Sequence, residues 1–470
     1  MRKTKIICTL GPATERTEVL RRLIQKGSDV FRLNMSHATH DWVRNIAPRI
    51  RTLAQRAGRA VALLFDTQGP AIRTGDLKTT LRLKPGDILE FTVRGAKSKE
   101  RYSVDVNYRG FAQDVAVGDT ILVDNGLIKL LVLDKQKNRV RCRVLTRAML
   151  GSRRHINLPG LHVNLPSLTA KDLADISLGI EMDADFIGLS FVREKSDIEQ
   201  LRKLLSRKKS KAQIVAKIED QLAVRSIDTM IESADVIMVA RGDLGIECPM
   251  EELPIIQRRI VKNCLRLGKP VVVATQLLES MITNPLPTRA EITDVANAVF
   301  EQSDALMLSG ETTVGRYPVE CVEVLHRVAM RIERSGGAGY AENAMLENIR
   351  QKTVASAVTL ANSLQDSKLV VFTVRGRMAQ YASNLRPHRA PIFAFTPTEE
   401  VYRQLSLYWG TFPVCIDFTG DPDKTIAVAE KFLRKNKWAK PGNHMVIISD
   451  VRMGRALVDS IQLRVVKRRH

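Results

Sequence analysis

The feature that most constrains the fold is a repeat of short apolar runs, each followed by a stretch with helical periodicity. Eight runs occur, and most are continuously apolar rather than alternating, which is typical of parallel strands covered on both faces. They are residues 3–9, 30–33, 60–65, 186–190, 214–217, 236–240, 271–274 and 305–308. Eight parallel strands that each precede a helix predict a closed (β/α)8 TIM barrel. Glycines 27, 58, 179 and 268 stand where helices of this repeat are expected to end.

One long insertion interrupts the repeat between the third and fourth strands. Residues 69–166 alternate apolar and polar side chains around turns at residues 85–87 and 125–126, which is typical of antiparallel strands. Loops that follow barrel strands lie at the active-site end, so we expect this inserted antiparallel β-barrel domain to be a mobile lid. After a break at residues 335–340, further strands alternate with helices and predict a C-terminal doubly wound α/β domain. The expected domains are a barrel of residues 1–68 and 167–345, a lid of residues 69–166, and a C-terminal domain of residues 346–470.

Composition and length favour a globular protein of two or three domains. No apolar run approaches the roughly 18 residues of a membrane span, and the apolar stretch at residues 6–10 is too short for a secretory signal. A cytoplasmic location is therefore expected. The 6 cysteines never form a C-x-x-C pair, which argues against a zinc ribbon or a disulfide framework. We expect reduced, mostly buried thiols.

The formal net charge of +22 raises the question of a nucleic-acid partner. The densest basic clusters, residues 206–211 and 465–470, are short and contain no interleaved aromatic residues. Aromatic residues make up only 5% of the chain, a poor supply for base stacking. We therefore expect no nucleic acid and no membrane partner, but a solvated basic surface whose field would also attract small anionic substrates.

Polar side chains follow the barrel strands at their carboxyl ends, where a barrel of this type carries its reactive groups. They are Arg32 and Asn34, Asp66 and Thr67, Ser190, Lys217 and Glu219, Arg241 and Asp243, Thr275, and Ser309 and Glu311. Glu219 and Asp243 offer hard oxygen ligands, and a pair of carboxylates suits Mg²⁺, which keeps waters and binds substrate phosphate oxygens. Lys217, Arg32 and Arg73 add positive charge for phosphate. This set predicts a phosphoryl-transfer site that works by positioning and electrostatics.

Each of these residues also has a simpler interpretation. Lys217 and Glu219, taken as an isolated pair, are more typical of a surface ion pair. Residues 241–243 read Arg-Gly-Asp, but an exposed adhesion tripeptide is not expected directly after a buried strand. Asp66 has the alternative role of capping the next segment, and a lone histidine such as His37 more often begins a helix. Only their joint occurrence at successive strand ends favours a shared site.

Several motifs, taken together and in order, show that the chain resembles the pyruvate kinase family over nearly its full length. The stretches that carry the resemblance are TKIICTLGPAT (4–14), RLNMSH (32–37), DTQGPAIRTG (66–75), NLPG (157–160), IVAKIED (214–220), IMVARGDLGIE (237–247), ATQLLESMITNPLPTRAEITDVANAV (274–299) and DALMLSGETTVGRYP (304–318). The resemblance implies the last step of glycolysis, in which phosphoenolpyruvate and ADP give pyruvate and ATP. It also implies a homotetramer.

The resemblance further implies roles for individual residues. Catalysis would fall to Lys217, which would stabilise the transferring phosphoryl group, to Thr275 beside the enolate, and to Arg32. Glu219 and Asp243 would hold Mg²⁺ or Mn²⁺. The remaining implied sets are Arg32, Arg73, Gly242, Asp243 and Thr275 for the substrate, Asn34, His37, Arg73 and Arg154 for the nucleotide, and Asn34, Ser36, Asp66 and Thr67 for K⁺.

The chain also departs from the family pattern. Ala71 stands where potassium-requiring members commonly have Glu and potassium-independent members have Lys, so the K⁺ requirement stays open. Arg154 and His155 replace a lysine–glycine pair on the nucleotide side, which keeps the charge but changes its geometry.

The effector loop of the C-terminal domain departs further, because Arg375 and Met378 replace two hydroxyl residues. Thr373, Arg375, Gly376 and Arg377 remain candidates for a sugar-phosphate or nucleotide effector. A loop that binds nothing is an equally good expectation.

Two other functions compete with the leading one. The first is a catalytically retired barrel that binds RNA through its basic charge, and the presence of all the catalytic groups argues against it. The second is another Mg²⁺-dependent barrel that acts on carbon–carbon bonds of phosphoenolpyruvate or pyruvate. The inserted lid and the third domain do not suit this second function.

Overall fold

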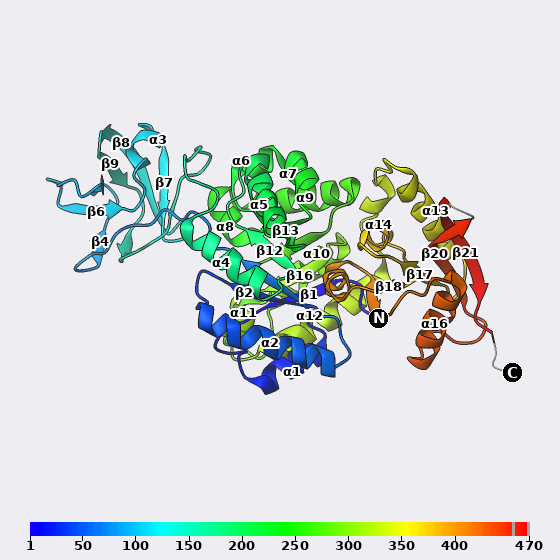
Figure 1. The fold of residues 1–470 in the computed structure, drawn as a ribbon. Coiled ribbons are helices and arrows are strands. Elements are labelled where there is room, and N and C mark those ends of the chain that lie inside the picture. Colours follow the sequence, from blue (N-terminus) through cyan, green and yellow to red (C-terminus); the bar gives the residue numbers. More distant parts are fainter. Residues whose placement is uncertain (454–455, 468–470) are drawn as a thin grey trace.

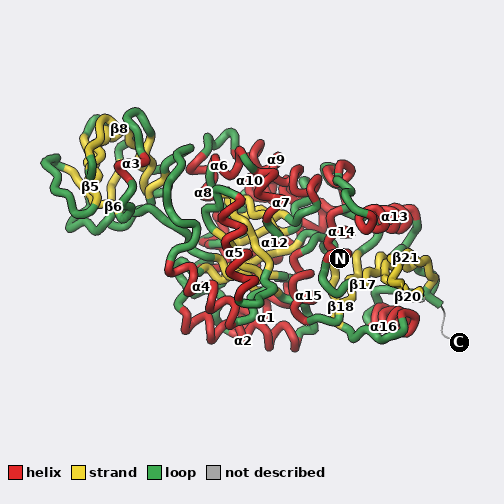
Figure 2. Tube along the Cα trace, turned by 45° about the horizontal axis from the view of Figure 1, so that its top comes forward, coloured by secondary structure: helices red, strands yellow, loops and turns green. Residues whose placement is uncertain are grey.

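The computed structural model describes residues 1–453 and 456–467, which form three parts in a row (Figure 1). The barrel lies in the middle, the inserted β domain projects from one end, and the C-terminal part lies at the other end, as a second view also shows (Figure 2). Among the described residues, no helix is long and apolar enough to cross a membrane. The cysteines are all free thiols and all but Cys415 are buried, as the sequence predicts.

Eight parallel strands close into the predicted barrel, in the order β1-β16-β15-β14-β13-β12-β3-β2. They are β1 Lys5–Thr9, β2 Val30–Asn34, β3 Ala62–Asp66, β12 Phe186–Leu189, β13 Gln213–Ile218, β14 Val236–Ala240, β15 Val271–Ala274 and β16 Ala305–Leu308. Apart from Asn34 and Gln213, every residue of these strands is buried. Side chains such as Leu64, Val215 and Met238 fill one apolar cluster, while their sequence neighbours pack against the surrounding helices. Cover on both faces explains the continuous apolar runs.

Helices surround the barrel between its strands. They are α1 Thr17–Lys26, α2 His40–Arg56, α4 Ala170–Glu181, α5 Lys195–Arg207, α6 Gln221–Arg225, α7 Ile227–Ser233, α8 Arg241–Glu247, α9 Leu253–Leu267, α10 Arg289–Phe300, α11 Gly310–Thr313 and α12 Pro318–Ile332. Short 3₁₀ helices lie at Glu279–Ile282, Glu333–Ser335 and Tyr340–Asn343, and another at Leu405–Leu407 belongs to the C-terminal part. Gly27 and Gly268 end their helices in the left-handed conformation, as predicted. The prediction for Gly179 is wrong, because Gly179 lies inside α4. A Cβ there would come within 3.2 Å of Phe65, so this glycine lets the helix pack closely on the barrel.

The inserted residues form a β domain with its own apolar core. Its elements are β4 Leu81–Leu83, β5 Ile88–Val93, β6 Tyr102–Val106, α3 Phe111–Asp114, β7 Thr120–Val123, β8 Ile128–Gln136, β9 Arg139–Val144, β10 Ala148–Leu150 and β11 Ile156–Asn157. The main sheet has the order β11-β7-β8-β9-β5-β6 and is antiparallel as predicted, except that β5 and β6 pair in parallel. The β7–β8 turn at Asp124, Asn125 and Gly126 has positive φ throughout, as its Asn-Gly sequence predicts.

The C-terminal part is a five-stranded sheet of order β19-β18-β17-β20-β21 with helices on both faces. Its elements are α13 Ile349–Ser363, β17 Lys368–Phe372, α14 Arg377–Asn384, β18 Ile392–Thr396, α15 Glu399–Gln404, β19 Thr411–Cys415, α16 Pro422–Lys435, β20 His444–Met453 and β21 Ala456–Val465. Val371 packs towards α13 and α14, whereas Val370 packs towards α16, as in a doubly wound domain. The antiparallel edge strand β21 is not among the predicted strands. Residues 468–470, which end the second basic cluster, lie outside the described residues.

Two ion pairs that involve buried carboxylates join the C-terminal part to the barrel. Asp185 and Asp304 immediately precede β12 and β16, so they lie at the amino ends of the barrel strands. Arg403 donates through Nε to Asp185 at 2.8 Å, and Arg386 donates through Nη2 to Asp304 at 2.7 Å. This contact uses the bottom of the barrel and leaves the carboxyl-end mouth facing the inserted β domain.

Candidate active site

A cavity of about 350 Å³ lies between the barrel mouth and the inserted β domain. Most of the predicted site residues line it. From the barrel come Arg32, Asn34, Ser36, Thr67, Lys217, Glu219 and Asp243, and from the inserted part come Arg73 and Arg154. Asp66 lies buried beneath the cavity, and Gly242, Thr275 and His37 do not line it. The carboxyl ends of separate strands therefore do converge, as the sequence pattern predicts.

The Lys217 ammonium lies at the centre of this arrangement. Its Nζ is 2.9 Å from Glu219 Oε1 and 3.2 Å from Asp66 Oδ1, and it donates to Ser190 Oγ at 2.8 Å. Burial alone would lower the pKa of Lys217, but the Asp66 and Glu219 carboxylates outweigh burial, so the pKa is raised. The amine is therefore charged. Lys217 and Glu219 do form an ion pair, but a buried one rather than the surface pair that the two residues alone would indicate.

The two candidate metal ligands have different surroundings. Glu219 uses Oε1 for Lys217, and its Oε2 accepts a hydrogen bond from the Phe191 N–H at 2.6 Å. Burial raises the pKa of Glu219, with the neighbouring Lys217 charge opposing it. The Asp243 carboxylate is half-buried, lines the cavity and has no hydrogen-bond partner among the described residues. Its free oxygens and the nearby Glu219 fit a hard cation that takes its other ligands from water and substrate.

No group of three or more His, Cys, Asp or Glu side chains in the described part of the chain could hold a metal ion. A cation that takes most of its ligands from water and substrate needs no such group.

Asp66 joins the two cationic side chains of the site. Its Oδ2 accepts from Arg32 Nε at 2.6 Å, while Oδ1 faces Lys217. Burial opposes ionisation of Asp66, but Lys217 and Arg32 outweigh it and hold the pKa of this carboxyl below its usual range. Thr67 donates through Oγ1 to the Gly188 carbonyl at 2.9 Å, so its hydroxyl hydrogen is already used.

The end of β15 is strained where it meets α8. Thr275 has φ of 72°, a value that is unusual for a β-branched residue. Its Oγ1 accepts a hydrogen bond from the Gly242 N–H at 2.7 Å, and its carbonyl accepts one from the Arg241 guanidinium at 2.8 Å. Arg241 is buried and also pairs with Asp294 at 2.7 Å. The Arg-Gly-Asp tripeptide is therefore not an exposed adhesion motif, because its arginine is buried and stabilises the fold.

The inserted β domain contributes a cationic wall to the cavity. Arg73 donates to the Arg153 carbonyl at 3.2 Å, and Arg154 lies 3.3 Å from Asp124 at the β7–β8 turn. The His155 ring packs on the Phe191 ring with centroids 5.9 Å apart. Burial lowers the pKa of His155, and the nearby Asp243 charge opposes that effect.

A second contact between the inserted part and the barrel involves a residue that the sequence analysis missed. Asn157 Nδ2 donates to Glu247 Oε1 at 3.0 Å, and both side chains are buried. Glu247 ends α8, four residues after Asp243, so the helix places both carboxylates on one face. Burial raises the pKa of Glu247 to about 7, with the Asn157 hydrogen bond opposing it. The i, i+4 spacing in the quoted GDLGIE stretch is the signal that could have identified it.

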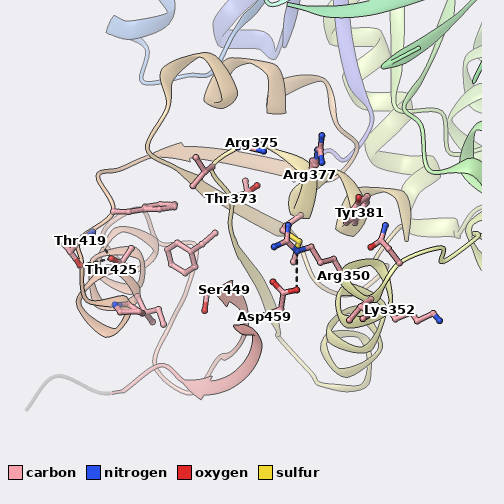
Figure 3. Close-up of a pocket in the computed structure, with 18 of the residues that line it drawn as sticks. Arg350, Lys352, Thr373, Arg375, Arg377, Tyr381, Thr419, Thr425, Ser449 and Asp459 are labelled. Atoms are coloured by element: carbon pink, nitrogen blue, oxygen red, sulfur yellow. Dashed lines mark hydrogen bonds and ion pairs between the residues drawn. The ribbon is translucent and has the colours of Figure 1, made fainter. Parts of the chain in front are cut away.

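A much larger cavity, of about 1150 Å³, lies in the C-terminal part (Figure 3). Thr373, Arg375 and Arg377 line it, whereas Gly376 does not, and adopts φ of 78° just before α14. Within this lining, Arg350 on α13 pairs with Asp459 on β21 at 3.3 Å (Figure 3). Aromatic side chains complete the lining, namely Phe372, Tyr381 and Phe418.

Comparison with known proteins identifies one family throughout. The family model described as "Pyruvate kinase, barrel domain" matches residues 1–322, and the one described as "Pyruvate kinase, alpha/beta domain" matches residues 351–462. A "Pyruvate kinase" of Geobacillus stearothermophilus is 42% identical over 474 residues, covering 96% of this chain and 78% of that protein. "Plastidial pyruvate kinase 3, chloroplastic" of Arabidopsis thaliana is 39% identical over 454 residues, covering 95% and 78%.

A solved structure agrees with these relatives. The crystal structure of a pyruvate kinase from Cryptosporidium parvum superposes with a TM-score of 0.94 at 33% identity, covering 99% of this chain and 96% of that one. Nothing in these comparisons supports the alternative of an RNA-binding protein on a retired barrel.

Proposed function

The chain belongs to the pyruvate kinase family, and from this premise we infer that it transfers the phosphoryl group of phosphoenolpyruvate to ADP, giving pyruvate and ATP. The observation that carries the assignment is the buried, charged Lys217 between Glu219 and Asp66, at a mouth that Asp243 also lines. Phosphoryl transfer needs positive charge and a metal-binding carboxylate pair at one point, and this mouth offers both.

We propose that Lys217 stabilises the transferring phosphoryl group and that Glu219 and Asp243 hold Mg²⁺ or Mn²⁺. When bound, the cation would neutralise charge on the phosphate oxygens. Lys217 bonds to Glu219 and Asp66 in the free protein, so it is already oriented before substrate arrives. The carboxylates keep it charged, and a phosphoryl group at the mouth would compete for the same ammonium.

The substrate would be bound by Arg32 and Arg73 at its phosphate. Its carboxylate would meet the backbone N–H groups of Gly242 and Asp243, where the Gly242 N–H now donates to Thr275 Oγ1. Substrate binding would therefore release the Thr275 hydroxyl beside the enolate carbon that accepts a proton. This change of hydrogen-bond partner supports a role for Thr275 in ordering the site around the enolate.

The nucleotide and the monovalent cation would bind beside the substrate. We propose Asn34, Arg73 and Arg154 as nucleotide contacts because they line the cavity, while His37 is exposed outside it and stays a prediction. The K⁺ set is Asn34, Ser36, Asp66 and Thr67. Ala71 lines the same cavity without a charge, so the K⁺ requirement is a matter for the assay.

We propose domain boundaries at residues 1–68 and 167–345 for the barrel, 69–166 for the lid and 346–470 for the C-terminal domain. The separate apolar cluster of the inserted strands supports treating them as one unit. The chain would work as a homotetramer, which the exposed side chains of Ile461, Leu463 and Val465 on the edge strand β21 support. The cytoplasmic location stays a prediction, since the relatives include bacterial and chloroplastic proteins.

We further propose that the C-terminal cavity takes a phosphorylated effector, a sugar phosphate or a nucleotide. Arg350, Lys352, Arg375 and Arg377 supply positive charge along its lining (Figure 3). The test is activation by fructose bisphosphate, ribose 5-phosphate or AMP, with the Arg375→Ala, Arg377→Ala double variant as control. A response lost in the double variant supports the site, and no response to any of the three removes the effector.

The reaction itself is tested by coupled pyruvate formation from phosphoenolpyruvate, ADP and Mg²⁺, with and without K⁺. Turnover that requires Mg²⁺ is expected, and the K⁺ series shows what Ala71 does. Absence of turnover under every condition would contradict the proposed function.

A further inference from the structure

Phe191 follows β12 and has an unusual backbone for an aromatic residue. Its φ is 53°, in the left-handed region that non-glycine residues rarely adopt. In this conformation its N–H donates to Glu219 Oε2 at 2.6 Å. Strained conformations of this kind persist only where the surroundings hold them, and they concentrate at functional sites.

Two residues of the insertion, His155 and Gly69, contact the Phe191 ring. His155, directly before β11, packs on it with ring centroids 5.9 Å apart and planes 60° apart. Gly69, at the start of the insertion, approaches the ring so closely that a Cβ would lie 2.9 Å from Phe191 Cδ2. The inserted domain therefore contacts the ring of the residue whose backbone N–H bonds Glu219, a candidate metal ligand.

The His155 side chain acts here by packing. Neither of its ring nitrogens makes a hydrogen bond within the described part of the protein, and the imidazole lies at the cavity wall close to Asp243 and Arg73.

We propose that His155 is a positioning residue that links the inserted β domain to the metal site: its ring holds Phe191 so that the Phe191 N–H orients Glu219. The proposal rests on the assignment of Glu219 as a metal ligand. Movement of the inserted domain away from the barrel would free the Phe191 ring and loosen Glu219, so metal affinity would depend on the position of that domain. Groups that orient metal ligands in this way typically change affinity by about 10- to 100-fold when removed.

The experiment measures the Kd of Mn²⁺ for the full-length free protein, from the EPR signal of unbound Mn²⁺ and without substrate. We expect His155→Ala to weaken Mn²⁺ binding about 10-fold and His155→Phe to restore most of the affinity, because a phenyl ring can pack on Phe191. The matched control is His162→Ala. His162 also joins the insertion to the barrel, through Glu194 at 3.4 Å, but it is exposed, and Glu194 is not a candidate metal ligand. Thermal melting of each variant verifies folding.

The outcomes separate this inference from the function on which it rests. If Glu219→Gln leaves the Mn²⁺ affinity unchanged, the metal site itself is wrongly assigned. If Glu219→Gln weakens binding while His155→Ala does not, only the role of His155 is overturned. Failure of His155→Phe to restore affinity would show that the imidazole nitrogens matter, and an equal effect of His162→Ala would show that any contact of the insertion suffices; either result contradicts the proposal.

Discussion

Replacing Glu247 by Gln should change how stability depends on pH. The Glu247 carboxyl is buried beside Asn157, and burial raises its pKa from 4.5 to about 7. A carboxyl whose pKa is raised by folding contributes stability that is complete below pH 4.5 and lost as the pH rises through 7. A difference of about 2.5 pKa units corresponds to about 3 kcal/mol of unfolding free energy. Gln keeps an oxygen that can accept from Asn157, but it cannot ionise.

The assay is equilibrium urea unfolding at several pH values between 5 and 8.5, for wild type and Glu247→Gln. The unfolding free energy of the variant minus that of wild type should rise by up to about 3 kcal/mol across this range. Contributions from other groups, Glu219 included, are common to both proteins and cancel in the difference. Glu251→Gln, an exposed position just after α8, is the control and should follow wild type. Parallel curves for wild type and Glu247→Gln would refute the reasoning.

Three further predictions concern other parts of the structure. Asp243→Asn should raise the Mg²⁺ concentration needed for half-maximal turnover at least 10-fold, because the free carboxylate that fits the cation is lost; an unchanged Mg²⁺ titration would contradict this. Arg386→Met should lower the unfolding free energy by about 3–5 kcal/mol, since it leaves the buried Asp304 without its cation, whereas a melt that matches wild type would show that the contact is dispensable. Gly69→Ala should cost about 1–3 kcal/mol, because φ is 71° and the new Cβ would meet Phe191, and thermal melting that is unaffected would argue against the close approach.

Much of the fold could be predicted because its signals are local. Continuous apolar runs between helices identified every barrel strand, and the Asn125-Gly126 turn identified the β7–β8 hairpin. The convergence of Lys217, Glu219 and Asp243 followed from one general property, that parallel strands of a barrel end at the same mouth.

What escaped prediction depends on contacts that no local pattern records. Phe191 acts through its backbone N–H, so its apolar side chain gives no hint of a role at the site. Glu247 acquires its raised pKa because folding buries it, which its sequence neighbours do not indicate. Gly179 looked like a helix end because glycine is common there, but close packing on Phe65 explains it instead. Strand β21 pairs only at the edge of a finished sheet, so it lacks the buried, continuous pattern of the others.

The central claim is that the barrel mouth transfers the phosphoryl group of phosphoenolpyruvate to ADP and that Lys217 stabilises this group during transfer. It is tested most directly by ³¹P NMR. Wild type and Lys217→Met are each mixed with phosphoenolpyruvate, ADP and Mg²⁺, and the resonances are followed with time. Wild type should deplete the phosphoenolpyruvate signal as the γ-phosphate signal of ATP grows, and Lys217→Met should slow this transfer by at least about 10²–10³-fold. Equal rates in the two proteins, or loss of phosphoenolpyruvate without formation of ATP, would contradict it.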